Sequence, residues 1–160
     1  VVIYDRIREN LIKYSSLKLE KSFDFGKWTL DNSIIYQIIN QNEDILNLPQ
    51  FMSRNTLFFS ERIFRNTLAI QTGLNFKIFS KYYANEYNPL ISDFHIQNQK
   101  KIGSFPLFDF FFNAKIRQTK IFIIAEHINS SFTGNNFYST PESVYRDFGV
   151  RFGFKWNLFN

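Results

Sequence analysis

The stretch RDFGVRFGFKWNLFN, residues 146–160, alternates large apolar side chains with small or charged ones. One series consists of Phe148, Val150, Phe152, Phe154, Trp156 and Leu158, and the other of Asp147, Gly149, Arg151, Gly153, Lys155 and Asn157. A period of two, sustained over this length, is the pattern of a β-strand with one apolar and one polar face. The sequence therefore predicts a strand whose two faces meet different media.

The amino-acid composition limits the class of protein. The 160 residues include 21 Phe and 8 Tyr, yet the mean hydropathy is −0.24, because the apolar residues are interleaved with polar ones. No run approaches the roughly 18 apolar residues that a transmembrane helix requires, which excludes a helical membrane protein. A chain of this length suits one domain, which we expect to cover residues 1–160.

Charge and cysteine content narrow the expected partners and cofactors. The net charge is +5, but the 19 Lys and Arg residues are scattered among 14 acidic residues instead of forming a stripe. This distribution argues against a nucleic-acid partner. The sequence has no cysteine, so disulfides and cysteine-based metal sites are excluded.

Six further segments carry the signals of strands. Alternation is clear over residues 17–25, 28–38, 68–82 and 108–116. The segments near 54–65 and 119–129 are rich in Phe and Ile but alternate poorly, so the direction of their side chains stays open. With the stretch at 148–158, the sequence predicts seven strands and an all-β fold.

The connections between these strands fall into two kinds that take turns along the chain. Short ones lie near residues 24–27, 65–67 and 117–120, and long polar ones near 42–53, 84–104 and 130–143. Short turns on one side and long loops on the other are typical of an antiparallel up-and-down transmembrane β-barrel. The alternative is a soluble sandwich or lipocalin-like barrel, in which the polar face would look outward.

Strand parity bears on the size of the predicted barrel. If the turn near residues 24–27 is periplasmic, the seventh strand also ends on the periplasmic side. A complete single-chain bacterial barrel has an even number of strands. We therefore expect this chain to supply the C-terminal seven or eight strands of a larger barrel, with residues 1–9 as the candidate for an eighth.

The polar positions of the strands are expected to line a polar interior. They are Lys18, Glu20, Lys77, Lys81, Asp109, Lys115, Arg117, Arg151 and Lys155. Charges around a water-filled lumen bias which ions pass, and the excess of basic residues leads to the hypothesis of a mild anion preference. The alternative is that the same residues pair into a network that plugs the interior.

The opposite positions are expected to face lipid. They are Trp28, Phe76, Phe110, Phe112, Phe152, Phe154 and Trp156. Both tryptophans lie near the predicted periplasmic ends of their strands, where an aromatic girdle is expected. Gly73, Gly149 and Gly153 share the inward face, where they either leave room for a loop or plug or let the strand bend.

Several blocks of sequence together resemble a known family. They are LPQFMSRNTLFFS (48–60), LAIQTGLNF (68–76), YYANEYNP (82–89), QNQKKIGSFP (97–106), AEHINSSFTGNNFYSTP (125–141) and RDFGVRFGFKWNLF (146–159). In this order they are similar to the C-terminal part of the putative porin family of Bacteroidota outer membranes. The resemblance covers roughly residues 11–160. It implies a β-barrel of the bacterial outer membrane, in contact with outer-membrane lipid and lipopolysaccharide.

The sequence offers little chemistry for catalysis. Glu126 and His127 are adjacent in a predicted strand and would point to opposite faces. His95 has only Asp93 nearby, so a solvated or locally hydrogen-bonded role is expected for both histidines. We therefore expect no catalytic residue, no metal and no cofactor.

Two functions remain open at this point. The first is a porin-like barrel that allows passage of small polar solutes. The second is a non-conducting accessory barrel of a larger outer-membrane complex for protein secretion, barrel assembly or nutrient uptake, with an outer-membrane protein or lipoprotein as partner. An outer-membrane enzyme would need Ser, His and an acid on one strand face, and the sequence shows no such set.

Replacing Phe110 or Phe152 by arginine tests the lipid-facing assignment. Arginine at mid-strand on the lipid face of a barrel costs on the order of 2–4 kcal/mol of stability. We expect Phe110→Arg and Phe152→Arg each to lower the free energy of unfolding in lipid bilayers by that amount. Denaturant titration measures this quantity, and a negligible change at both positions would count against the assignment.

Overall fold

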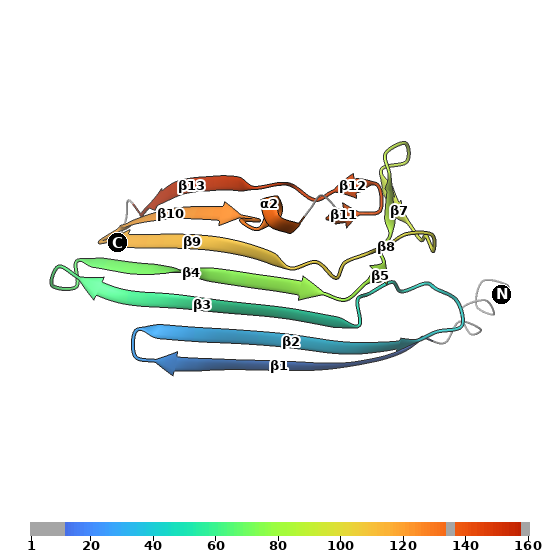
Figure 1. The fold of residues 1–160 in the computed structure, drawn as a ribbon, viewed down its shortest axis with the longest axis horizontal. Coiled ribbons are helices and arrows are strands. Elements are labelled where there is room, and N and C mark those ends of the chain that lie inside the picture. The colour runs from blue at the N-terminus through green and yellow to red at the C-terminus, as the bar shows by residue number, and fades with distance from the viewer. Residues whose placement is uncertain (1–11, 134–136, 158–160) are drawn as a thin grey trace.

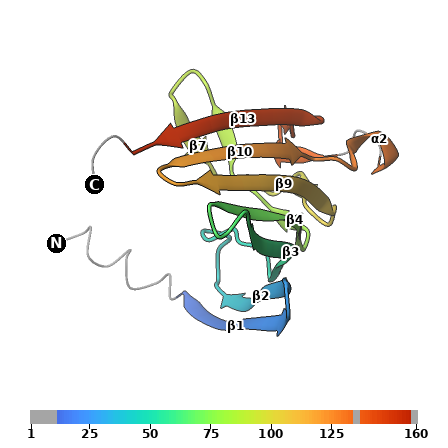
Figure 2. The ribbon, with the colours of Figure 1, turned by 90° about the vertical axis from the view of Figure 1, so that its left-hand side faces the viewer.

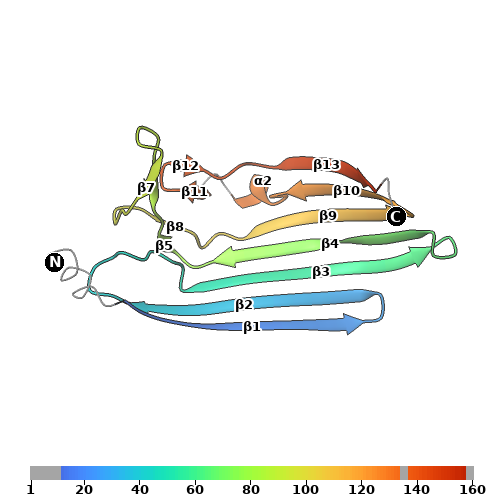
Figure 3. The same ribbon diagram turned by 180° about the vertical axis from the view of Figure 1, so that it is seen from behind.

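The computed structural model describes residues 12–133 and 137–157, most of them in β-strands. Seven strands form one antiparallel sheet in the order β1-β2-β3-β4-β9-β10-β13 (Figure 1, and Figure 3 from behind). Their bounds are β1 (Lys13–Phe25), β2 (Trp28–Asn40), β3 (Phe51–Ile63), β4 (Leu68–Phe79), β9 (Leu107–Ile116), β10 (Thr119–Glu126) and β13 (Gly149–Trp156). The seven predicted strands and the all-β antiparallel fold are confirmed. The predicted eighth strand at residues 1–9 and the predicted strand position Leu158 lie outside the described residues.

The sheet is a single open layer. β1 and β13 form its two edges, and Figure 2 shows the strands stacked in one layer between them. The seven described strands therefore do not close into a barrel, and the predicted closure needs additional strands. Within residues 12–133 and 137–157, no helix is long and apolar enough to cross a membrane.

The short connections lie together at one end of the sheet, and the long ones at the other (Figure 1). Gly26 and Lys27 join β1 to β2, and Gly26 has a φ of 70°, the left-handed backbone that tight hairpin turns require. At the opposite end, β10 stops at Glu126, three residues earlier than predicted. His127 has a φ of 53°, which turns the chain away from the sheet.

The strand register sorts the side chains onto two faces. Residues that pair directly across neighbouring strands project to the same side, and we define the apolar face as the positions in register with Leu57 and the polar face as those in register with Thr56. Across the apolar face, one row of directly paired residues consists of Phe23, Leu30, Leu57, Leu74, Phe110, Ala125 and Val150. In this row, apolar residues of all seven strands therefore project to one side of the sheet.

One row of the apolar face carries polar side chains. Lys21, Asn32 and Asn55 are directly paired across β1, β2 and β3, and the Asn55 side-chain amide donates a hydrogen bond to Ser53 Oγ at 2.9 Å. The same row continues into Phe76 and Phe108 on β4 and β9. In this row, the apolar face is therefore interrupted over β1–β3 and aromatic on β4 and β9.

The long connections contain small elements of their own. β5 (Tyr82–Tyr83) pairs with β8 (Lys101–Ile102), β6 (Glu86–Asn88) with β7 (Asp93–His95), and β11 (Tyr138–Thr140) with β12 (Ser143–Val144). A four-residue helix, α2 (Ser130–Thr133), follows β10. In Figures 1 and 3 the β6–β7 hairpin runs across the direction of the sheet strands.

The buried core of the described residues lies at the long-loop end and not on the sheet faces. Phe105, Leu107 and Phe137 form a buried cluster against which Phe79 and Tyr145 pack. The rings of Phe105 and Phe137 meet edge to face with centroids 4.8 Å apart. A single-layer sheet leaves most of both faces uncovered, so the loops folded over its end supply most of the burial. The prediction of merely polar loops was incomplete.

Two phenylalanines of the connection between β10 and β13 allow a matched test of the buried cluster, which we call the loop core. Phe137 is 4% exposed and Phe132, in the same connection, is 88% exposed. Because truncating a buried Phe costs about 3–5 kcal/mol, we expect Phe137→Ala to speed hydrogen exchange over residues 127–148 while β4 and β9 stay protected. Phe132→Ala is the control and should leave exchange unchanged. Equal effects of the two variants would show that the loops have no shared core.

Candidate functional site

The polar face of the sheet gathers most of the charged residues predicted to line an interior. Lys18, Glu20, Lys77, Asp109, Lys115, Arg151 and Lys155 all lie on it. Lys81 follows the end of β4, and Arg117 lies in the turn between β9 and β10, so strand alternation does not direct either side chain. The register adds three basic residues that the sequence did not assign to this face: Arg54, Arg62 and Lys120.

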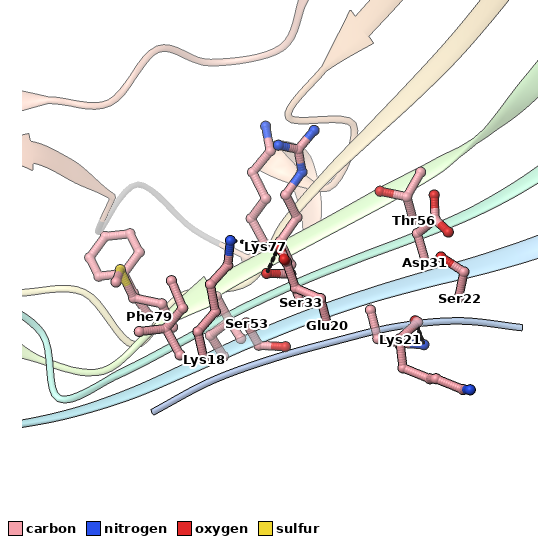
Figure 4. Close-up of a pocket in the computed structure, with 15 residues that line it drawn as sticks. Lys18, Glu20, Lys21, Ser22, Asp31, Ser33, Ser53, Thr56, Lys77 and Phe79 are labelled. Carbon is pink, nitrogen blue, oxygen red and sulfur yellow. Dashed lines mark hydrogen bonds and ion pairs between the residues drawn. The ribbon is translucent and has the colours of Figure 1, made fainter. Parts of the chain in front are cut away.

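A groove of about 860 Å³ lies over β1–β4 on this face. Its lining includes Lys18, Glu20, Ser33, Arg54 and Lys77, several of which project to the same side of the sheet in Figure 4. Lys18 Nζ lies 2.7 Å from Glu20 Oε1. Arg54 stands directly opposite Lys77 and makes no ion pair within the described residues. The charged side chains of the groove are therefore only partly neutralised.

Asp109 connects the sheet to the loop that follows β10. Its Oδ2 lies 2.6 Å from Lys77 Nζ on the neighbouring strand, and its Oδ1 accepts a hydrogen bond from the backbone N–H of His127 at 3.0 Å. The Asp109 side chain is buried, which strengthens both interactions because little water competes for them. One carboxylate thus ties β4, β9 and the start of the 127–148 loop together.

Glu126 forms a second charged cluster at the end of β10. It pairs with Arg151 on β13 and, at 3.1 Å, with Arg146 just before that strand. Glu126 therefore offsets the charge of two arginines at once. Pairing of the kind expected for a plugging network thus occurs at Lys18–Glu20, Lys77–Asp109 and the Glu126 cluster, and that it plugs an interior stays a prediction.

His127 is one of the most buried side chains among the described residues, at 1% exposure. Its Nδ1 lies 2.9 Å from the Arg146 carbonyl oxygen and therefore donates to it, while Nε2 has no hydrogen-bond partner in the described part of the chain. The ring meets Phe137 edge to face at 4.5 Å. The local hydrogen bond expected for His127 is confirmed, and the solvated alternative is wrong. His95 lies 3.6 Å from Glu86 in the β6–β7 hairpin.

The polar face also carries a band of aromatic rings and glycines. Phe58, Phe111 and Phe122 all face this side. A Cβ at Gly153 would lie 2.7 Å from the Phe122 ring, and one at Gly73 would lie 2.7 Å from the Phe58 Cβ. At Gly73 and Gly153 the close neighbour is a residue of an adjacent strand and not the loop or plug expected from the sequence, and the expected bending of the strand stays a prediction. Gly149 has open space beside it.

The residues predicted to face lipid share the other side of the sheet. Trp28, Phe76, Phe110, Phe112, Phe152, Phe154 and Trp156 all lie on the apolar face. Phe152 is 82% exposed, and nothing in the described chain covers it. That this face meets lipid stays a prediction. The described residues contain no group of three or more side chains able to hold a metal ion.

Long antiparallel strands, one exposed apolar face and one charged face define the class: a wall of a porin-like β-barrel. Comparison with protein families agrees with this class. The family model described as "Putative porin" matches residues 8–160, and the chain belongs to that family. Comparisons with curated proteins and with solved structures gave no match. Membership indicates an outer-membrane, channel-type protein.

Proposed function

We propose that the chain forms part of a passive channel through which small polar solutes diffuse across the outer membrane. The observation that carries the proposal is the contrast between the two faces of one sheet. The apolar face exposes rings such as Phe152 and Trp156, which suit a hydrocarbon surrounding. The polar face presents charged side chains that a water-filled interior would solvate. No catalytic step is part of the proposed function.

The charges of the polar face support a preference for anions. The basic residues there are Lys18, Arg54, Arg62, Lys77, Lys115, Lys120, Arg151 and Lys155, and the acidic ones are Glu20, Asp24, Asp31, Asp109 and Glu126. Ion pairing neutralises some of the basic residues, but Arg54 and Lys115 keep no acidic partner within the described residues. The excess positive charge would attract anions into the interior.

One observation favours the accessory-barrel alternative. The tip of the β6–β7 hairpin exposes Leu90, at 93%, together with Ile91 and Phe94. An apolar tip at the long-loop end of the sheet is a suitable contact for another protein. In that case the ion pairs of the polar face would belong to a closed interior.

Single-channel recording of the natively purified full-length protein in planar bilayers separates these functions. We expect steady open conductance and an anion-selective reversal potential in a KCl gradient. The double variant Arg54→Glu and Lys115→Glu should shift that potential toward cations, because both changes reverse unpaired charges on the polar face. Lys13→Glu is the control, since Lys13 lies on the apolar face, and should leave the potential unchanged.

Two outcomes of this experiment would contradict parts of the proposal. A silent barrel that copurifies with stoichiometric protein partners, identified by mass spectrometry, would contradict the channel and favour the accessory function. An open channel whose selectivity ignores both charge reversals would retain passage but remove the role given to the polar face.

A further inference from the structure

A row of basic side chains crosses the polar face close to the short turns. Lys115 on β9 stands directly opposite Lys120 on β10, and Lys120 stands directly opposite Lys155 on β13. The same row continues in the other direction through Ala69 to Arg62 on β3. We call Arg62, Lys115, Lys120 and Lys155 the basic row. All four side chains are exposed.

This arrangement is unfavourable for the sheet by itself. Directly opposed residues on neighbouring strands have Cβ atoms about 4.5–5.5 Å apart, and like charges in that position repel. Elsewhere on the polar face, acidic residues offset such repulsion, as Asp109 does for Lys77. No carboxylate forms an ion pair with any member of the basic row within residues 12–133 and 137–157.

The neighbouring row supplies no negative charge either. It runs through Ser60, Gln71, Asn113, Phe122 and Gly153. In this row the Asn113 amide donates to Gln71 Oε1 at 3.4 Å, and the Phe122 ring lies over Gly153. Polar amides and an aromatic ring can flank a bound ligand, but they leave the charge of the basic row uncompensated.

We propose that the basic row binds a small multivalent oxyanion of the phosphate class. Lysine ammonium groups are strong donors to phosphate oxygens, and here they stand on consecutive strands. Three strands at a spacing of about 4.8 Å span roughly 10 Å, which fits phosphate or pyrophosphate better than a polymer. A single chloride would offset only one of the adjacent charges, whereas a multivalent anion offsets several at once.

The position of the basic row determines where a bound oxyanion would lie. It lies at the short-turn end of the polar face, beside the β9–β10 turn, so a bound oxyanion would sit at one mouth of the proposed interior. The inference therefore rests on the proposed function in taking this face as water-filled. Ala69, between Arg62 and Lys115 in the row, adds no charge to it.

Pyrophosphate titration of the full-length protein tests the site. With KCl carrying the current in planar bilayers, we expect inorganic pyrophosphate to reduce conductance in a saturable manner. Lys120→Gln removes the central charge and should raise the half-blocking concentration about tenfold. Arg54→Gln is the matched control, because it deletes an unpaired charge on the same face outside the row, and should raise the half-blocking concentration far less than Lys120→Gln does.

The variants should fold, because Lys120→Gln relieves repulsion instead of creating it. Equal blocking concentrations in the wild type and Lys120→Gln, or an equal loss in Arg54→Gln, would overturn the proposed site. A barrel that carries no KCl current would contradict the proposed channel alone. Calorimetric titration of soluble pyrophosphate into the folded full-length protein, in phospholipid-free detergent, then decides the site by the same comparison of variants.

Discussion

The hydrogen-bond register between neighbouring strands is the constraint on which both faces of the sheet depend. Side chains alternate along a strand, so a slip of one residue exchanges the two faces of that strand. The observed register holds Lys77 against Asp109 on one side and pairs Leu74 with Phe110 on the other. Within hydrocarbon, every backbone group must also find its partner inside the sheet, which penalises any local loss of this register.

The polar face is divided by the same register into zones of different chemistry. Ion pairs such as Lys77–Asp109 and Arg151–Glu126 lie toward the long loops, and the band of rings and glycines follows. The basic row lies nearest the short turns. Because Asp109 also accepts from the His127 backbone, the ion-paired zone is joined to the loop core. The loops are therefore held in a defined position over one end of the face that is proposed to conduct.

Alternation in the sequence was sufficient to predict five of the seven strands and most of the charged positions of the polar face, because a period of two is visible without any tertiary information. The strands near 54–65 and 119–129 were predicted from their Phe and Ile content. Alternation failed at Phe58, Phe111 and Phe122, where consecutive apolar residues hide which one faces inward. Lys115 and Lys155 were placed correctly, but their alignment with Lys120 depends on pairing between strands, which local sequence does not encode. The contact of Phe105 with Phe137 likewise joins two loops that look merely polar and irregular in the sequence.

The central claim is that the polar face meets water and the apolar face meets lipid. Nitroxide labels at single cysteines along residues 150–155 test it directly, and these residues contain no native cysteine to compete for the label. In liposomes, we predict that labels at positions 150, 152 and 154 collide mainly with oxygen dissolved in lipid. Labels at 151 and 155 should collide mainly with a water-soluble nickel chelate. A pattern without a period of two, or with the opposite phase, would contradict the assignment of the two faces.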